Sequence, residues 1–237
     1  MSCANNLKQI GLALHNYADV HPHKLFPAGS ISNVGLDPDR RLSWFVEILP
    51  FLEEDDLYRK FDRRGGWDSP PNISLSETPL QVLECRGWRE QNSAAQPWET
   101  AYVGFAGVGR DTATLPLGAP NIGAFGYDRQ ITFSDVKDGT SNTLMVLESA
   151  RETGPWAQGG FSTVRSLDPE DKPYLGPTHP FGGTHFSENN VFNRGHSIGC
   201  NGLMMDGSIR FLRDSTSPDV LEAMATIAGG EKIPEDY

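Results

Sequence analysis

The chain has 237 residues, within the range of one β-rich or α+β domain, and 38% of them are hydrophobic, which is enough for a core. Its 25 Gly and 17 Pro favour turns and long loops over a helical bundle. The net charge of −11 argues against nucleic-acid binding, because contacts to phosphates need clustered Lys and Arg.

An amphipathic helix is predicted over residues 3–20. Leu7, Ile10 and Leu14 recur at three- and four-residue spacing, which places them on one helical face, and Pro22 ends the helix. No apolar run reaches the roughly 18 residues that a membrane span needs, and no signal peptide is present. The abrupt helical start predicts that a further segment precedes this helix in the full-length protein.

A second helical region is predicted over residues 42–61. Ser43 is its N-cap, and Pro50 should kink or split it. Beyond a tight Gly- and Pro-containing loop the pattern changes towards strands, and residues 82–85 and 101–108 are the first candidates.

The second half of the chain is predicted to complete a sheet. Residues 143–148 resemble a buried strand, whereas residues 151–195 are irregular and are interpreted as a loop excursion over the surface. Asp206 and Gly207 stand between two apolar runs, which is a strong signal for a hairpin. A last helix is predicted over residues 218–228, with Pro in its first position.

This order of elements predicts an α+β fold, in which the N-terminal helix packs on an antiparallel β-sheet with long loop insertions. The elements do not alternate as βαβ units, and the sequence contains no internal repeat. Residues 1–237 are therefore predicted to form a single domain.

Motifs along the whole chain resemble the planctomycete prepilin-like family that is known by its H-x9-DG motif. The first is a Cys-x-Asn-Asn block at Cys3, and the last is His196 followed after nine residues by Asp206 and Gly207. Stretches between them match in the family's order: Phe26-Pro27, Ser43-Trp44, Leu49-Pro50-Phe51-Leu52-Glu53, Trp67-Asp68-Ser69-Pro70 with Asn72, Cys85, Tyr102-Val103-Gly104 and Asp138-Gly139-Thr140-Ser141-Asn142-Thr143. Arg86 departs from the family, which commonly has Pro there.

The resemblance implies a type IV pilin-like or pseudopilin-like fold, export from the cytoplasm and no established catalytic activity. It also implies that residues 1–22 are the lower part of a long spine helix, whose missing hydrophobic half lies upstream. We therefore expect a protein of the cell envelope or the exterior that assembles with itself or with other pilin-like subunits. Contact with a membrane is expected only through the upstream helix, nucleic acid is not an expected partner, and the protein is not expected to be an enzyme.

Four residues are candidate metal ligands. Asp68 and Asn72 carry oxygens at a spacing that can ligate Ca²⁺, in competition with turn and capping roles. His196 and Asp206 of the motif could hold a metal ion or form an acid–base pair, although the Asp of an Asp-Gly turn usually serves the turn itself. Calcium is the one cofactor that this pattern indicates.

The chain contains three cysteines, so at most one disulfide can form within it. Cys3 with Cys85 is the candidate pair because it would tie the N-terminus to the body of the domain, which leaves Cys200 free. No two cysteines are spaced as CxxC, which argues against a structural zinc site. His179 and His185, together with the motif histidine, are a weaker candidate for a transition-metal site.

Two alternative functions stay open. One is an extracellular carbohydrate-binding or hydrolytic head, in which a surface glycan lies against aromatic residues of the irregular segment: Trp156, Phe161, Tyr174, Phe181 and Phe186. The other is an adhesion module that calcium stabilises. Neither a Gly-x-Ser-x-Gly nucleophile motif nor a Walker-type phosphate loop occurs in the sequence.

Overall fold

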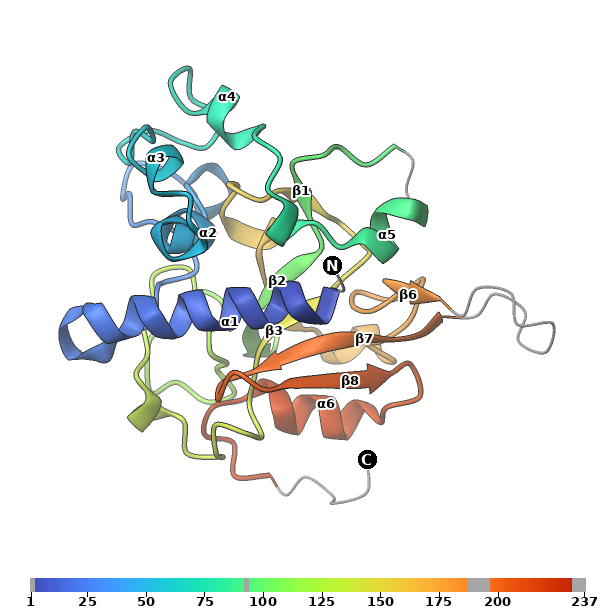
Figure 1. Ribbon diagram of the computed structural model, residues 1–237. Coiled ribbons are helices and arrows are strands. Elements are labelled where there is room, and N and C mark those ends of the chain that lie inside the picture. The colour runs from blue at the N-terminus through green and yellow to red at the C-terminus, as the bar shows by residue number, and fades with distance from the viewer. Residues whose placement is uncertain (1–2, 92–93, 187–196, 232–237) are drawn as a thin grey trace.

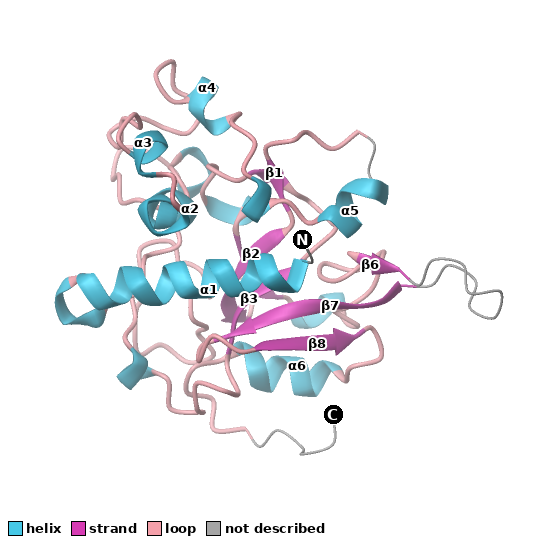
Figure 2. Cartoon of the chain, viewed as in Figure 1, coloured by secondary structure: helices cyan, strands magenta, loops and turns pink. Residues whose placement is uncertain are grey.

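The computed structural model describes residues 3–91, 94–186 and 197–231, and it confirms the predicted α+β fold (Figure 1). Helices come first in the chain, strands dominate the middle, and a helix follows the last strand. Figure 2 shows that loops and turns occupy much of the chain between these elements, as the Gly and Pro content predicts. None of the helices in the described part combines the length and the apolar character needed to span a bilayer.

The main sheet is mixed. Its strands pair in the order β5 (Val164–Leu167), β2 (Tyr102–Val108), β3 (Leu144–Glu148), β7 (Ser197–Met204) and β6 (His185–Phe186), and β8 (Ile209–Arg213) also pairs with β7. All of these pairs are antiparallel except β2 with β5. A separate two-stranded sheet joins β1 (Glu99–Thr100) to β4 (Gly154–Pro155).

Six α-helices are found in the described residues: α1 (Cys3–Val20), α2 (Trp44–Ile48), α3 (Asp55–Tyr58), α4 (Ile73–Ser76), α5 (Arg86–Gln91) and α6 (Pro218–Ala225). Short 3₁₀ turns lie at Pro22–Lys24, Pro38–Arg40, Leu49–Leu52, Gln81–Leu83, Phe133–Asp135, Gly160–Ser162 and Pro169–Asp171.

Helix α1 crosses one face of the sheet (Figure 1). Leu7, Ile10 and Leu14 are fully buried on its inner face, and the burial of each contributes roughly 1.5–3 kcal/mol. Gly11 allows the helix to approach β7 closely, because a Cβ atom there would come within 2.8 Å of Leu203 Cδ1. The predicted helical face is therefore the face that packs on the sheet.

Helix α6 covers the opposite face, so the sheet lies between two helical layers. Alternate residues of β7 face the two layers. Leu203 lies in the core under α1, and Met204 lies in the core under α6. Val220 and Leu221 of α6 belong to the second core. Burial on both faces explains why the central strands are apolar at consecutive positions.

Several local predictions are confirmed. Ser43 caps α2 by accepting the Phe45 N–H at 3.2 Å, and the helical region breaks near Pro50 into α2, a 3₁₀ turn and α3. Strands β2 and β3 lie where strands were expected, and β7 and β8 form the hairpin around Asp206 and Gly207.

The strand predicted at residues 82–85 is wrong, because a 3₁₀ turn over Gln81–Leu83 occupies this segment. The side chain of Asn6 in α1 donates to the carbonyl oxygens of Gln81 and Glu84, at 3.3 and 2.8 Å. These carbonyl groups therefore bond to a helix and not to a neighbouring strand.

Residues 151–195 are more ordered than their sequence suggests. Their described part contributes β4, β5 and β6, although the stretch expected as a strand at 161–164 is mostly a 3₁₀ turn before β5. Trp156, Tyr174 and Phe181 from this segment are buried in the core.

Candidate functional site

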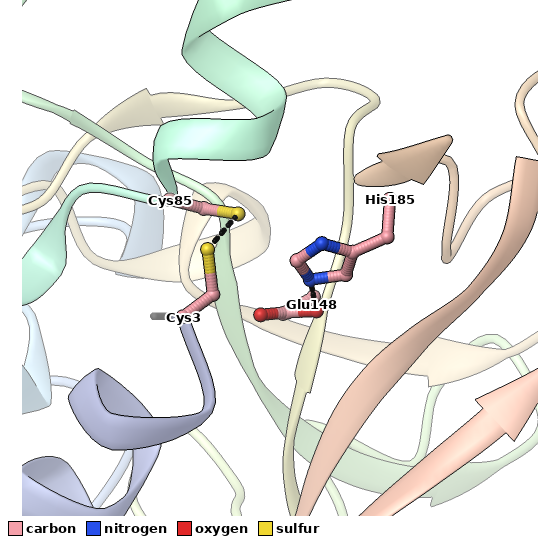
Figure 3. A group of neighbouring side chains, drawn as sticks. All are labelled: Cys3, Cys85, Glu148 and His185. Carbon is pink, nitrogen blue, oxygen red and sulfur yellow. Dashed lines mark hydrogen bonds and ion pairs between the residues drawn. The ribbon is translucent and has the colours of Figure 1, made fainter. Parts of the chain in front are cut away.

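Four side chains from distant parts of the sequence meet at the first turn of α1 (Figure 3). They are Cys3 of α1, Cys85 just before α5, Glu148 at the end of β3 and His185 at the start of β6. One donor atom from each lies within 4.8 Å of the donor atoms of the other three. We call these four residues the Cys-His-Glu cluster.

Sheet topology brings Glu148 and His185 together. Strand β8 pairs along one edge of β7, so β3 and β6 follow one another along the other edge. His185 pairs with Gly199, and Glu148 follows the Leu147 position that pairs with Gly202. The two side chains therefore stand about two residues apart along β7 and face the same side of the sheet.

The two cysteine sulfurs lie 3.0 Å apart. The pKa of Cys3 is lowered to about 4, because its sulfur accepts hydrogen bonds from the Cys85 thiol, His185 and the backbone N–H of Gly87. The pKa of Cys85 is raised, because its thiol donates to Cys3 and is buried. The pair therefore favours ionisation at Cys3 over ionisation at Cys85.

Glu148 is fully buried, and several donors surround its carboxylate. Its Oε2 atom contacts His185 Nε2 at 2.8 Å and accepts the backbone N–H of Asn201 at 2.6 Å. The Asn201 side-chain amide and the Thr184 hydroxyl also donate to Oε2, both at 3.1 Å. These contacts hold the carboxylate in one orientation.

His185 is the cluster member nearest to solvent, with its side chain 24% exposed. Its pKa is raised to about 10, because the imidazole bonds to Cys3 and to Glu148. Gly87 lets α5 lie directly against β6, since a Cβ atom there would come within 2.6 Å of the Thr184 carbonyl oxygen. The imidazole is thus enclosed between the sulfurs and the buried carboxylate.

Two thiols, an imidazole and a carboxylate offer three kinds of chemistry: a disulfide, metal ligation, or an ion-paired thiolate nucleophile. Cys3 is 5% exposed and Cys85 and Glu148 are 0% exposed, so both sulfurs and the carboxylate lie beneath the surface. Within residues 3–91, 94–186 and 197–231, this is the only place where three or more His, Cys, Asp or Glu donors converge.

A comparison with models of known protein families identifies the family of this chain. The model of a family described as "Protein of unknown function (DUF1559)" matches residues 1–219. The chain belongs to the DUF1559 family. The match spans the whole Cys-His-Glu cluster, but it does not identify the narrower H-x9-DG prepilin-like group, which stays a prediction. Neither a curated protein nor a solved structure matches the chain.

The DUF1559 chain brings together one predicted pair, Cys3 and Cys85, whose sulfurs lie 3.0 Å apart without a bond between them. Cys200 lies apart from them, fully buried in the core under α6. The proximity of the two sulfurs agrees with the predicted pairing, but whether they form a disulfide stays a prediction.

Asp68 and Asn72 bond to other protein groups in the DUF1559 chain. The Asp68 carboxylate pairs with Arg40 Nη2 at 2.9 Å. Asn72 is fully buried; its Oδ1 accepts the Asp62 N–H at 2.9 Å and its amide donates to the carbonyl oxygens of Asp62 and Gly66. Calcium binding at these residues stays a prediction, and their oxygens already have protein partners.

Asp206 and Gly207 form the turn between β7 and β8. Asp206 Oδ1 accepts the Ser208 N–H at 2.9 Å, and Gly207 has a φ of +83°, which favours glycine. His15 of α1 bonds to the Met205 carbonyl oxygen at 3.0 Å, which ties this turn to the helix. The other member of the motif, His196, lies outside the described residues.

Sequence reasoning missed Glu148 and the partners of His185. Glu148 is the one charged residue in the otherwise apolar strand β3. A charged residue is rarely fully buried without a partner, so its position at the end of a buried strand was a usable signal. The identity of the partner of Glu148 could not be predicted in the same way, because it depends on how β3 and β6 pair along β7.

A second feature is a hollow of about 240 Å³ on the surface beside β5. Of the five aromatic residues considered for a glycan groove, Trp156, Tyr174 and Phe181 are buried, whereas Phe161 is 47% exposed and lines this hollow. Its other lining residues include Tyr127, Arg110, Glu152, Asp168 and Asp171.

Proposed function

We propose that this DUF1559 chain is the head of an exported, pilin-like surface or envelope protein that acts in assembly or binding and not in catalysis. The observation that carries the proposal is the position of α1, an 18-residue amphipathic helix laid across the sheet. A helix packed in this way on a mostly antiparallel sheet is the arrangement expected for the lower half of a pilin-like spine.

The outer face of α1 supports a role in assembly. Leu12 is 62% exposed and Val20 is 67% exposed, although both are apolar residues of a well-packed helix. Leu12 lies beside Phe51, Leu52 and Val82 at the edge of a surface hollow. Neighbouring copies or other pilin-like subunits would bury this side of the helix.

The chemistry of the Cys-His-Glu cluster supports a role other than catalysis. Its sulfurs and its carboxylate are buried, which leaves a cysteine nucleophile without open access to a substrate. Reactive cysteines are at least partly exposed, whereas buried structural cysteines are inert.

The test of this proposal is the coding sequence upstream of Met1, followed by cell fractionation. We expect about 20 hydrophobic residues directly before α1. The longer protein should then sediment with the envelope, whereas the 237-residue chain should stay in the soluble fraction. A stop codon directly upstream of a bare start codon would contradict the anchor.

A second candidate is a glycan-binding role on the same scaffold, and the hollow at Phe161 favours it. An exposed aromatic ring beside carboxylate and guanidinium groups is a common arrangement for a polar ligand of sugar size. Titration with soluble oligosaccharides, followed by NMR, should shift signals from this hollow. Phe161→Ala should remove those shifts, and the absence of shifts in the wild type would exclude this candidate.

A further inference from the structure

We propose that the Cys-His-Glu cluster binds one divalent metal ion of the zinc class and thereby fastens the first turn of α1 to the sheet. This inference goes beyond the proposed assembly function and does not depend on it. It rests on the kind, position and support of the four donor groups.

The donor set selects the class of metal. Zinc and metals like it bind Cys thiolates, His nitrogen and Asp or Glu oxygen, commonly four at a time in a tetrahedron. Two sulfurs and a nitrogen are poor ligands for Ca²⁺ or Mg²⁺, which take oxygen ligands. Cys3, Cys85, His185 and Glu148 provide one complete tetrahedral set with no ligand left over.

The distances are close to those of a metal site. Four donors bound to one zinc ion at 2.0–2.3 Å lie roughly 3.3–3.8 Å from one another, and the cluster's donors lie within 4.8 Å. The sulfurs, 3.0 Å apart, would separate by roughly 0.8 Å to reach the ~3.8 Å of two zinc-bound thiolates. A disulfide requires the opposite movement, to about 2.05 Å.

A second layer of contacts orients the donors, as in known metal sites. The backbone N–H groups of Gly87 and Trp88 bond to the sulfurs of Cys3 and Cys85 respectively. Asn201 and Thr184 hold the Glu148 carboxylate. Such donors stabilise the negative charge that thiolates and a carboxylate bring to a bound ion.

Glu148 distinguishes a metal site from a simple disulfide. A disulfide between Cys3 and Cys85 would be neutral and would use neither the carboxylate nor the imidazole. Burying a carboxylate is costly without a cation or several hydrogen bonds. Glu148 has hydrogen bonds from Asn201 and Thr184, and its carboxylate also lies beside the two sulfurs and His185 (Figure 3). A divalent cation would be coordinated by all four groups.

Metal binding would join four segments that are far apart in the sequence. Cys3 and Cys85 are 82 residues apart, and Glu148 and His185 are 37 apart. One ion would connect α1, the start of α5 and the adjoining ends of β3 and β6. The orientation of α1 on the sheet would therefore depend on the metal.

The experiment is a titration of the full 237-residue chain with Co²⁺ and then Zn²⁺, after purification with a reductant and without oxygen. We expect one equivalent of Co²⁺ to bind and to produce the near-ultraviolet absorption band of a Co²⁺–thiolate bond. Zn²⁺ should then displace the bound Co²⁺. The dissociation constant for Zn²⁺ should be about 10⁻⁷ M or lower.

Matched variants locate the site. Cys85→Ala should abolish the cobalt thiolate band, whereas Cys200→Ala, which removes an equally buried thiol elsewhere, should leave it unchanged. Glu148→Gln retains the size of the side chain and should weaken Zn²⁺ binding markedly. Asn201→Ala removes the side-chain amide that contacts both Glu148 and His185, and it should weaken binding by roughly 10- to 100-fold. Circular dichroism of each variant identifies any that fail to fold.

Three results would overturn the proposal. The first is fully reduced, folded wild-type protein that takes up neither Co²⁺ nor Zn²⁺. The second is binding that Cys85→Ala leaves intact. If mass spectrometry finds Cys3 and Cys85 joined as a disulfide in protein folded with Zn²⁺ present, the metal site is also rejected, and the upstream-anchor test of the assembly function is unaffected.

Discussion

The Cys-His-Glu cluster and the loop over residues 65–72 are both rich in polar groups, but they use them differently. In the loop, the oxygens of Asp68 and Asn72 bond to nearby protein groups, and Asn72 is enclosed by carbonyl and N–H groups within ten residues of it. In the cluster, four donors from distant segments point at one another. Spacing in the sequence favoured the loop as a metal site, whereas convergence in the fold favours the cluster.

The largest expected effect is at the carboxylate of the cluster. Glu148→Ala should lower the free energy of unfolding by about 3–5 kcal/mol, because it leaves buried donors from Asn201, Thr184 and His185 without their acceptor. Urea denaturation measures the change. Glu148→Gln is the control and should cost clearly less, since it retains an acceptor oxygen; equal losses in both variants would contradict this role of the carboxylate.

A smaller effect is expected at the centre of the loop. Asn72→Ala should lower the free energy of unfolding by about 2–3 kcal/mol, because the buried amide contacts of Asp62 and Gly66 lose their partner. Melting curves with Ca²⁺ and with a calcium chelator provide the comparison. We expect them to coincide, and a clear rise with Ca²⁺ that Asn72→Ala removes would establish the calcium site that the spacing indicates.

Substitution of Asp68 should change the free energy of unfolding less than substitution of Asn72. Its ion pair with Arg40 is near the surface, with side chains 27% and 61% exposed respectively, so Asp68→Asn should change the free energy of unfolding by about 0–1 kcal/mol. Urea denaturation at low and high salt is the measurement. A loss as large as that of Asn72→Ala would show that the loop depends on the charge.

The smallest effect on stability is expected at the outer face of α1. Leu12→Lys should leave the free energy of unfolding within about 0.5 kcal/mol of the wild type, because this side chain is exposed. In the longer, anchored protein the same change should reduce assembly, measured by sedimentation or cross-linking. If assembly is unchanged, the outer face of α1 does not form the proposed contacts between subunits.

Local signals explain which parts of the fold could be predicted. The spacing of Leu7, Ile10 and Leu14 defines α1, and the Asp-Gly pair at 206–207 defines the β7–β8 hairpin, because each signal lies within one element. The prediction at residues 82–85 was wrong because a 3₁₀ turn forms there, and Asn6, far away in the sequence, bonds to the carbonyl groups of Gln81 and Glu84.

The cluster could be predicted only in part, for the same reason. The Cys3–Cys85 pairing was expected, but the absence of a CxxC spacing argued against zinc, and that rule detects only donors that lie close together in the sequence. Glu148 and His185 meet because β3 and β6 follow one another along the same edge of β7. No pattern in either strand alone contains that pairing.

The most direct test of the central claim is the melting temperature of the reduced chain with and without Zn²⁺, in the wild type and in Cys85→Ala. With free Zn²⁺ at 1,000 times its dissociation constant, the wild type should gain about 4 kcal/mol, which raises its melting temperature by roughly 10 °C. Cys85→Ala should show no gain, and Cys200→Ala should behave as the wild type. If the melting temperature of the reduced wild-type chain does not change when Zn²⁺ is added, the proposed metal site is contradicted.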